Sequence, residues 1–288
     1  MQNQACSYSS GRRIPRELEA LVNRVPTLLA IANASSYVFM VVMNGLATTL
    51  PLNGRTTAEI SDSFANTFAP AGYVFSIWGV IYTALMAFLG YQFTARGRAS
   101  VAIDRIGWLF VVNAIANGIW IVFWHYGMFP ATMAMTIVLL GTLCAIAVRI
   151  GTPAQAATRS DRWFVHLPFA IYLGWVSVAT IANAAVMFLD MGWNGEPLTP
   201  EAWTLALIAI ATGIGAVMVM RRGEIAFAAV LIWAFIGIAV KQVEAAWVPE
   251  GAQAAASLLA VMSAGRLIAG LIGRASTRDS ETPPVAVV

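Results

Sequence analysis

The sequence of 288 residues is 59% hydrophobic and only 11% charged, and its formal net charge is +3. About a quarter of the residues of a typical soluble domain are charged, so this composition excludes an ordinary soluble protein and indicates a polytopic membrane protein. The apolar runs do not alternate with polar residues as the strands of a membrane barrel do, which leaves a bundle of helices.

The first 26 residues lack the apolar core of a signal peptide. Residues 14–26 place Leu18, Leu21, Val22 and Val25 on one helical face, beside basic side chains. This pattern predicts an amphipathic helix that lies on the membrane surface within a cytoplasmic tail, residues 1–26.

Eight apolar windows follow, and each has the length of about 20 residues that a membrane-spanning helix needs. They cover approximately residues 27–50, 70–94, 106–126, 130–149, 164–189, 202–220, 225–243 and 252–273. The expected fold is therefore all-α, a polytopic transmembrane bundle of about eight spans. We expect a five-span bundle over residues 27–190, three additional spans over residues 191–273, and a polar, disordered tail over residues 274–288.

Basic residues test this topology, because Lys and Arg accumulate in cytoplasmic loops. All of them except Arg55, Lys241 and Arg266 lie before the first window, after the last, or in the connections that follow the second, fourth and sixth windows, with Arg149 as the last residue of the fourth window. This distribution places both termini in the cytoplasm and the protein in the cytoplasmic membrane. It also explains the basic excess without a nucleic-acid partner.

Two connections on the outer side are long. The first, residues 51–69, contains an expected capped helical turn at Thr56–Ile60, and the second, residues 189–203, is rich in Gly, Pro and acidic residues. Several tryptophans lie at the ends of the windows, where an aromatic belt at the membrane surface is the expected role: Trp108, Trp163, Trp193, Trp203 and Trp247.

Three windows present faces that mix aromatic rings with polar groups. The faces are Phe75, Trp78 and Tyr82 in the second window, Asn113, Asn117, Trp120 and Trp124 in the third, and Tyr172, Trp175, Ala179 and Asn183 in the fifth. An Asn side chain without partners in hydrocarbon costs a few kcal/mol, so these amides should face the bundle interior and their aromatic neighbours with them. The converging rings either fill a bulky core or line a cavity for a flat, apolar ligand with polar edges.

Three runs on these faces carry a family resemblance. They are PAGYVFSIWGVIY (residues 70–82), ANGIWIVFW (116–124) and PFAIYLGWVSVATIAN (168–183). In this order they resemble the second, third and fifth spans of the TspO/translocator-protein family, also called tryptophan-rich sensory proteins, and the resemblance extends over approximately residues 30–190. The most specific match is Tyr172, Leu173, Trp175 and Asn183 in the fifth span.

In that family, five helices enclose a pocket beneath the long first loop, which takes porphyrins, sterols and synthetic aromatic ligands. The resemblance implies that a similar site is lined or framed by Pro70, Tyr73, Phe75, Trp78, Tyr82, Asn117, Trp120, Trp175, Ala179 and Asn183. The shared helical faces add Asn113, Trp124 and Tyr172 to this set.

The sequence also departs from the family pattern. Ala71 and Tyr73 occupy positions where the family usually has Pro and Trp, and the chain is one residue shorter between Tyr73 and Trp78. One residue rotates the start of a helix by about 100° relative to its continuation. The last three windows have no counterpart in the five-helix proteins.

The expected function is therefore that of a membrane receptor for a porphyrin or for a sterol-like or carotenoid-like lipid, in sensing, sequestration or passage, with no required cofactor. One alternative is an uncoupled facilitator or accessory permease, and another is a membrane enzyme that acts on a lipid or tetrapyrrole. Ion-coupled transport is disfavoured because no window has an Asp or Glu near its middle. The sequence leaves open whether the protein forms a homodimer.

Metal and redox chemistry has little support in the sequence. No group of His, Cys and carboxylate residues has the spacing of metal ligands, and no nucleophile has a nearby base. His125, on the outer side, is a candidate axial ligand for a haem iron, against the simpler role of an interfacial histidine. His166 lies on the inner side, about a bilayer thickness away.

Overall fold

The computed structural model describes residues 24–50, 52–193 and 195–280, and these ranges contain helices but no strand. Every one of the eight apolar windows is a helix. The helices are α2 (Thr27–Thr49), α4 (Ile77–Gln92), α7 (Leu109–His125), α8 (Phe129–Ile150), α10 (Leu167–Asp190), α11 (Pro200–Val217), α12 (Ile225–Lys241) and α13 (Val248–Ser280).

Six helical segments are long and apolar enough to cross a membrane, which confirms the all-α polytopic fold. The two shorter apolar helices, α7 and α12, have 17 residues each. At 1.5 Å per residue they measure about 25 Å, at the lower limit for a span. Shorter elements connect the spans: α3 (Thr57–Asp62), α5 (Ala95–Arg98), α6 (Val101–Ile106), α9 (Arg159–Asp161), the 3-10 turns η1 (Leu52–Gly54), η2 (Gly72–Ser76) and η3 (Pro153–Gln155), and the π-helical turns η4 (Arg162–His166) and η5 (Met218–Arg222).

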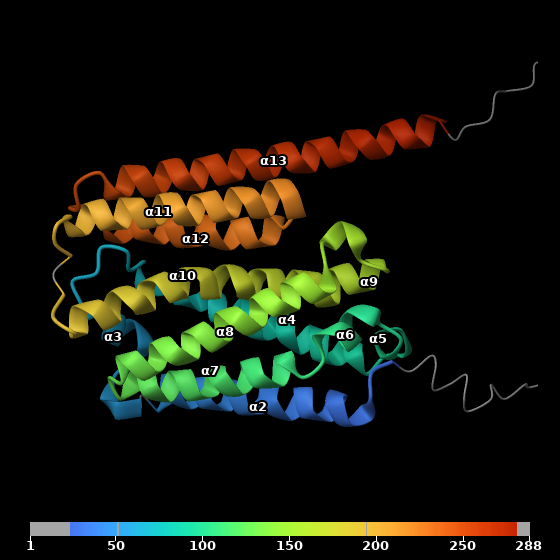
Figure 1. Cartoon of the computed structure of the whole chain (residues 1–288), viewed down its shortest axis with the longest axis horizontal. Helices are drawn as coiled ribbons and strands as arrows, with labels where there is room; N and C mark the ends of the chain where they lie inside the picture. The colour runs from blue at the N-terminus through green and yellow to red at the C-terminus, as the bar shows by residue number, and fades with distance from the viewer. Residues whose placement is uncertain (1–23, 51, 194, 281–288) are drawn as a thin grey trace, which may run out of the picture.

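Five of the helices form a closed ring. Each packs on the next in the order α2, α7, α8, α10 and α4, and α4 returns to α2. The remaining three helices form a layer on one side of this ring, where α12 packs on α10 and α13 packs on both α11 and α12 (Figure 1). The five-span part and the three-span part therefore meet along α10 and α12.

The two ends of the bundle differ in charge. The connections that contain α5, α6 and α9 lie at one end, opposite α3 (Figure 1), and we call it the basic end. There the Arg98 guanidinium donates to the Thr27 hydroxyl, and that of Arg222 donates to the carbonyls of Ala147 and Gly151. The Arg222 guanidinium thus binds carbonyl groups at the C-terminal end of α8, where positive charge is favourable.

The two termini differ in part from the expectations. Residues 14–23 of the expected amphipathic helix lie outside the described residues, and residues 24–26 are not helical. At the other end, α13 continues to Ser280, so residues 274–280 are helical where the sequence predicted disorder. This stretch contains neither Pro nor Gly, and an existing helix extends at much lower cost than a new one forms.

Residues 52–71, which we call the capping segment, lie at the end of the ring opposite the basic end. Its helix α3 begins with the predicted cap. The backbone N–H of Thr56 donates to the Glu59 carboxylate at 2.6 Å, and the N–H of Glu59 donates to the Thr56 hydroxyl at 3.2 Å. This reciprocal pair satisfies two backbone donors at the start of the helix and fixes where it begins.

Helix α12 holds the capping segment and the start of η2 in place. Trp233 Nε1 donates to the Val74 carbonyl, and the Ala71 N–H donates to the Gly237 carbonyl. At the end of the helix, Gln242 Nε2 donates to the carbonyls of Asn66 and Ala69. Lys241 forms an ion pair with Asp62. The additional spans therefore secure the segment that covers the five-helix ring.

The close approach at Gly237 gives a test of this attachment. A Cβ atom at position 237 would lie 2.1 Å from Val74 Cγ2 and 3.2 Å from Pro70 Cβ. We expect Gly237→Ala to lower the free energy of unfolding by about 1–3 kcal/mol, measured by thermal or denaturant unfolding in detergent. The matched control is Gly213→Ala, because no atom lies within 4 Å of a Cβ there. Equal stability of the two variants would contradict the attachment.

Candidate ligand-binding site

A small cavity lies between the capping segment and the interior of the five-helix ring. Its volume is about 40 Å³. The residues that line it are Thr57, Ser61, Pro70, Phe75, Trp78, Trp120, Trp124, Trp175, Ala179, Ala182 and Asn183. They come from α3, the loop after it, η2, α4, α7 and α10, so three of the five ring helices and the capping segment meet here.

Four indole rings dominate the walls of the cavity. Trp78 lies at the centre, with ring centroids 6.4 Å from Trp120 and 6.2 Å from Trp175. Trp120 stacks on Trp124 at 5.6 Å, and the Trp124 indole N–H donates to the carbonyl of Thr57 in α3 at 3.3 Å. A hydrogen bond therefore joins the tryptophan cluster directly to the capping segment.

The rings occupy most of the space that a ligand would need. A volume of about 40 Å³ holds only one or a few water molecules, whereas ligand pockets usually measure about 300–1,000 Å³. Of the two alternatives that the sequence left open, the packed aromatic core therefore describes this structure better. A larger guest can enter only if the rings move apart.

Polar groups at the cavity wall lack hydrogen-bond partners. Trp175 and Asn183 are 2% and 3% exposed, and the indole N–H of the first and both amide ends of the second have no partner. The hydroxyl of Tyr82, one turn along α4 from Trp78, is buried and unpartnered as well. Buried polar groups are nearly always hydrogen-bonded, so this set of exceptions marks a place where a ligand or water would find partners.

Beside the cavity, hydrogen bonds join three helices. Asn44 of α2 donates to the Asn117 Oδ1 of α7 at 2.8 Å, and Asn117 Nδ2 donates to the Tyr172 hydroxyl of α10 at 2.9 Å. Asn117 and Tyr172 are completely buried. The predicted inward orientation of this amide is confirmed, and its role here is to connect helices.

The structure brings most of the predicted site residues together, and their binding of a ligand stays a prediction. Those that line the cavity are Pro70, Phe75, Trp78, Trp120, Trp124, Trp175, Ala179 and Asn183. Tyr82 and Tyr172 contact Trp78, with ring centroids 5.5 and 5.9 Å away, and Asn117 reaches the site through Tyr172.

Two predicted residues lie elsewhere. Tyr73 is 45% exposed and packs edge-on against Trp233 of α12, because the chain enters α4 through the 3-10 turn η2, which turns Tyr73 away from the ring. Asn113 faces α8, where it donates to the Leu139 carbonyl and the Thr142 hydroxyl. The prediction that these two residues line the site is wrong.

The sequence analysis missed three lining residues: Thr57, Ser61 and Ala182. The first two belong to α3, and the capping pattern at Thr56–Ile60 predicted the helix without indicating which of its sides faces the ring. Ala182 precedes Asn183, and no helical face of the sequence singled it out.

The geometry gives limited support for a haem ligand. His125 is 2% exposed, its Nδ1 bonds the Ile121 carbonyl at 2.7 Å, and its Nε2 has no partner. It is not among the residues that line the cavity. In the described part of the chain, no group of three His, Cys, Asp or Glu residues is placed to hold a metal ion.

Comparison with known proteins bears on the identity of this bundle. A family model described as TSPO-like protein matches residues 30–269. The chain belongs to the TSPO-like protein family. The match extends past the five-span part through most of α13, further than the resemblance seen in the sequence. Searches of curated proteins and of solved structures gave no match.

Membership of the TSPO-like family, together with the helices long enough to cross a bilayer, establishes a multi-pass membrane protein. The family points in general to ligand binding and sensing at a membrane. Each of the three motif runs that carried the resemblance contributes at least one tryptophan to the cluster.

A separate cavity of about 260 Å³ lies at the basic end, between the starts of α10 and α12. His166 and Glu224 line it, next to the π-helical turn η4 and the end of η5. The His166 ring is 2% exposed, and neither of its nitrogens has a partner. Burial raises the pKa of Glu224 to about 7, against a smaller opposite effect of Arg222.

Removing the acceptor of the Asn117 Nδ2 hydrogen bond tests how much this bond contributes to the stability of the fold. Tyr172→Phe leaves the buried Asn117 Nδ2 without its acceptor, so we expect the free energy of unfolding to fall by about 1–3 kcal/mol. Tyr126→Phe, at a residue 58% exposed, is the control and should change stability little. A Tyr172→Phe variant as stable as this control would show that the bond contributes nothing.

The buried Glu224 predicts a pH dependence. Its folded pKa of about 7 exceeds the ordinary value of 4.5, so the fold favours the protonated acid. The stability that this group contributes is present below about pH 4.5 and is lost as the pH rises through about 7. We expect the thermal midpoint to fall less between pH 5 and pH 8 in Glu224→Gln than in the wild type. The exposed control Glu244→Gln should keep the wild-type fall.

Proposed function

We propose that this TSPO-like protein is a membrane receptor that binds a flat, hydrophobic molecule with polar edges, of which a porphyrin is the first choice, within its tryptophan cluster. The observation that carries the proposal is the set of unpartnered polar groups on Trp175 and Asn183 in a wall that four indole rings dominate. A planar ligand with polar edges supplies hydrogen-bond partners for the Trp175 indole N–H and for the Asn183 amide.

In this proposal, binding replaces contacts between the indole rings with contacts between those rings and the ligand. The rings of Trp78, Trp120 and Trp175 separate and pack on the ligand faces, so the apolar surface that they bury is retained. The polar edge of the ligand then pairs with Asn183 and the Trp175 indole N–H. An unpartnered buried polar group costs about 1–3 kcal/mol, and the ligand recovers part of this cost.

The contents of the ring below the site favour a receptor over a facilitator. Toward the basic end the interior is filled by Phe88, Phe110 and Phe169, whose ring centroids lie 5.1–5.9 Å apart. The three rings are at most 2% exposed. A ligand that entered beneath the capping segment would stop above these rings, which suits sensing or sequestration.

The direction of entry follows from the charge distribution. We place the basic end in the cytoplasm and the capping segment on the outer face of the cytoplasmic membrane, since Lys and Arg favour the cytoplasmic side. Ligand then enters from the outer side, and the capping segment, held by α12, must move to admit it.

The test is a fluorescence titration of the purified full-length protein with protoporphyrin, sterols and carotenoids. Saturable quenching of tryptophan emission is expected for the preferred ligand. Asn183→Leu should weaken binding about tenfold, because the ligand loses its polar partner. Trp175→Phe should reduce the quenching amplitude and the affinity.

Trp163→Phe is the matched control, since Trp163 is 55% exposed and lies at the basic end. It should leave the affinity unchanged. If every ligand quenches without saturation, or if Asn183→Leu binds as tightly as the wild type, the proposed site is wrong. Flux of a labelled ligand into vesicles would favour the facilitator, and chemical change of the ligand would favour an enzyme.

A further inference from the structure

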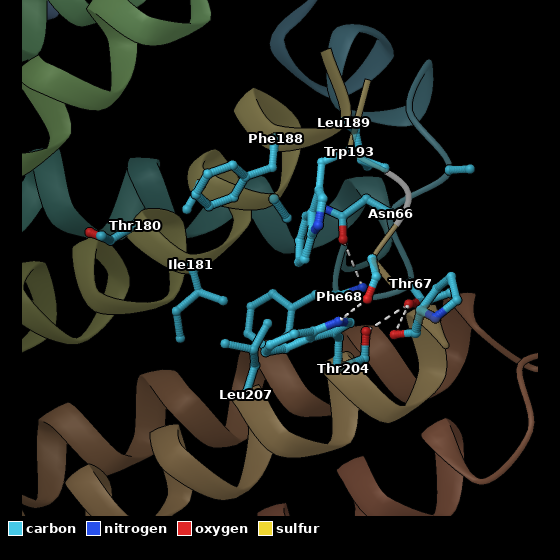
Figure 2. Close-up of a pocket in the computed structure, with 16 residues that line it drawn as sticks. Asn66, Thr67, Phe68, Thr180, Ile181, Phe188, Leu189, Trp193, Thr204 and Leu207 are labelled. Carbon is cyan, nitrogen blue, oxygen red and sulfur yellow. Dashed lines mark hydrogen bonds between the residues drawn. The ribbon is translucent and has the colours of Figure 1, made fainter. Parts of the chain in front are cut away.

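A larger cavity lies outside the five-helix ring, between α10 and α11. Helix α10 packs mainly on α8 and α12, and α11 packs mainly on α13, so α10 and α11 leave space between their facing sides (Figure 2). The cavity has a volume of about 520 Å³, within the usual range of ligand pockets. It shares no lining residue with the tryptophan site.

The wall of this cavity is apolar and uncharged. Ile181, Ala184 and Phe188 face it from α10, Leu207 faces it from α11, and Phe68 comes from the capping segment. None of the lining residues has a charged side chain. A charged ligand would lose its hydration without gaining a counter-charge, so the chemistry selects a neutral guest.

The hydrogen-bonding groups gather at one end, near the capping segment (Figure 2). The hydroxyls of Thr67 and Thr204 lie 2.6 Å apart. Asn66, 9% exposed, accepts from the Phe68 N–H through Oδ1 and has no partner for Nδ2. At the far end, the Thr180 hydroxyl already donates to the Val176 carbonyl within α10. An elongated guest with a single polar end fits this division.

Aromatic residues form part of the cavity wall. Trp193 packs against Phe188 and Trp203, with ring centroids 5.4 and 5.5 Å away, and the Trp203 indole N–H donates to the Gly195 carbonyl. Trp193 and Phe188 are 41% and 43% exposed. The belt role expected for Trp193 and Trp203 is therefore incomplete, because both line this cavity.

We propose that this cavity binds a neutral lipid with a long apolar body and one oxygen-bearing head group, such as a long-chain or polyisoprenoid alcohol. The head lies at Asn66, where a small displacement of the amide lets the head-group oxygen accept from the unpartnered Nδ2, and the body extends along Ile181 and Leu207. This site goes beyond the proposed receptor function, and either can fail without the other.

The experiment uses the full-length protein in phosphatidylcholine vesicles and a long-chain alcohol with a photoreactive diazirine at the end of its chain. Labelling, mapped by mass spectrometry, is expected in residues 180–184 and at Leu207, where the end of the chain lies when the head is at Asn66. A chain-matched hydrocarbon and a chain-matched carboxylate at pH 8 should label these segments about tenfold less, because the first lacks the head-group hydrogen bond and the second carries a charge.

A pair of substitutions locates the label. Ala184→Trp fills the cavity and should reduce labelling by the alcohol about tenfold. Ala209→Trp adds the same ring to the exposed face of α11, outside the cavity, and should leave labelling unchanged.

Competition on the wild type provides a measurement that does not depend on the folding of a variant. An excess of the unlabelled alcohol should remove the label saturably. Labelling that does not saturate, or that is equal for the alcohol, the hydrocarbon and the carboxylate, would mean that the cavity holds only bulk membrane lipid and would overturn the proposal. Labelling confined to other segments would do the same.

Discussion

Side-chain amides that must find partners away from lipid fix how the ring helices are rotated. Asn33 of α2 donates to Gln92 of α4, and the bonds from Asn44 through Asn117 to Tyr172 join α2, α7 and α10. Each bond requires the polar sides of its helices to face one another, because an acyl chain offers no partner. The aromatic residues that share those sides then meet in the ring interior, and the tryptophan cluster is the result.

The same constraint explains why Asn183 is informative. It lies on the inward face of α10, like Tyr172, yet it finds no protein partner there. An inward amide that serves helix packing is expected to be bonded, as Asn117 is. An inward amide that remains unbonded beside a cavity contributes little to packing, and the proposed ligand site rests on this difference.

Much of this arrangement could be predicted from the sequence, because the spans, the charge asymmetry and the meeting of Trp78 with Trp175 follow from hydropathy and helical spacing. The exceptions have local causes. The 3-10 turn before α4 redirects Tyr73, and two acceptors on α8 hold the Nδ2 of Asn113 away from the site. The volume left between the rings depends on side-chain rotamers. The space between α10 and α11 depends on how two parts of the chain dock, which no periodicity encodes.

The attachment of the capping segment to α12 has a consequence for communication across the membrane. Helix α12 begins beside Glu224 at the basic end and ends at Lys241, which is paired with Asp62 at the other end. Helix α12 thus provides one direct mechanical connection between the first loop at one end of the bundle and the cavity that contains His166 at the other.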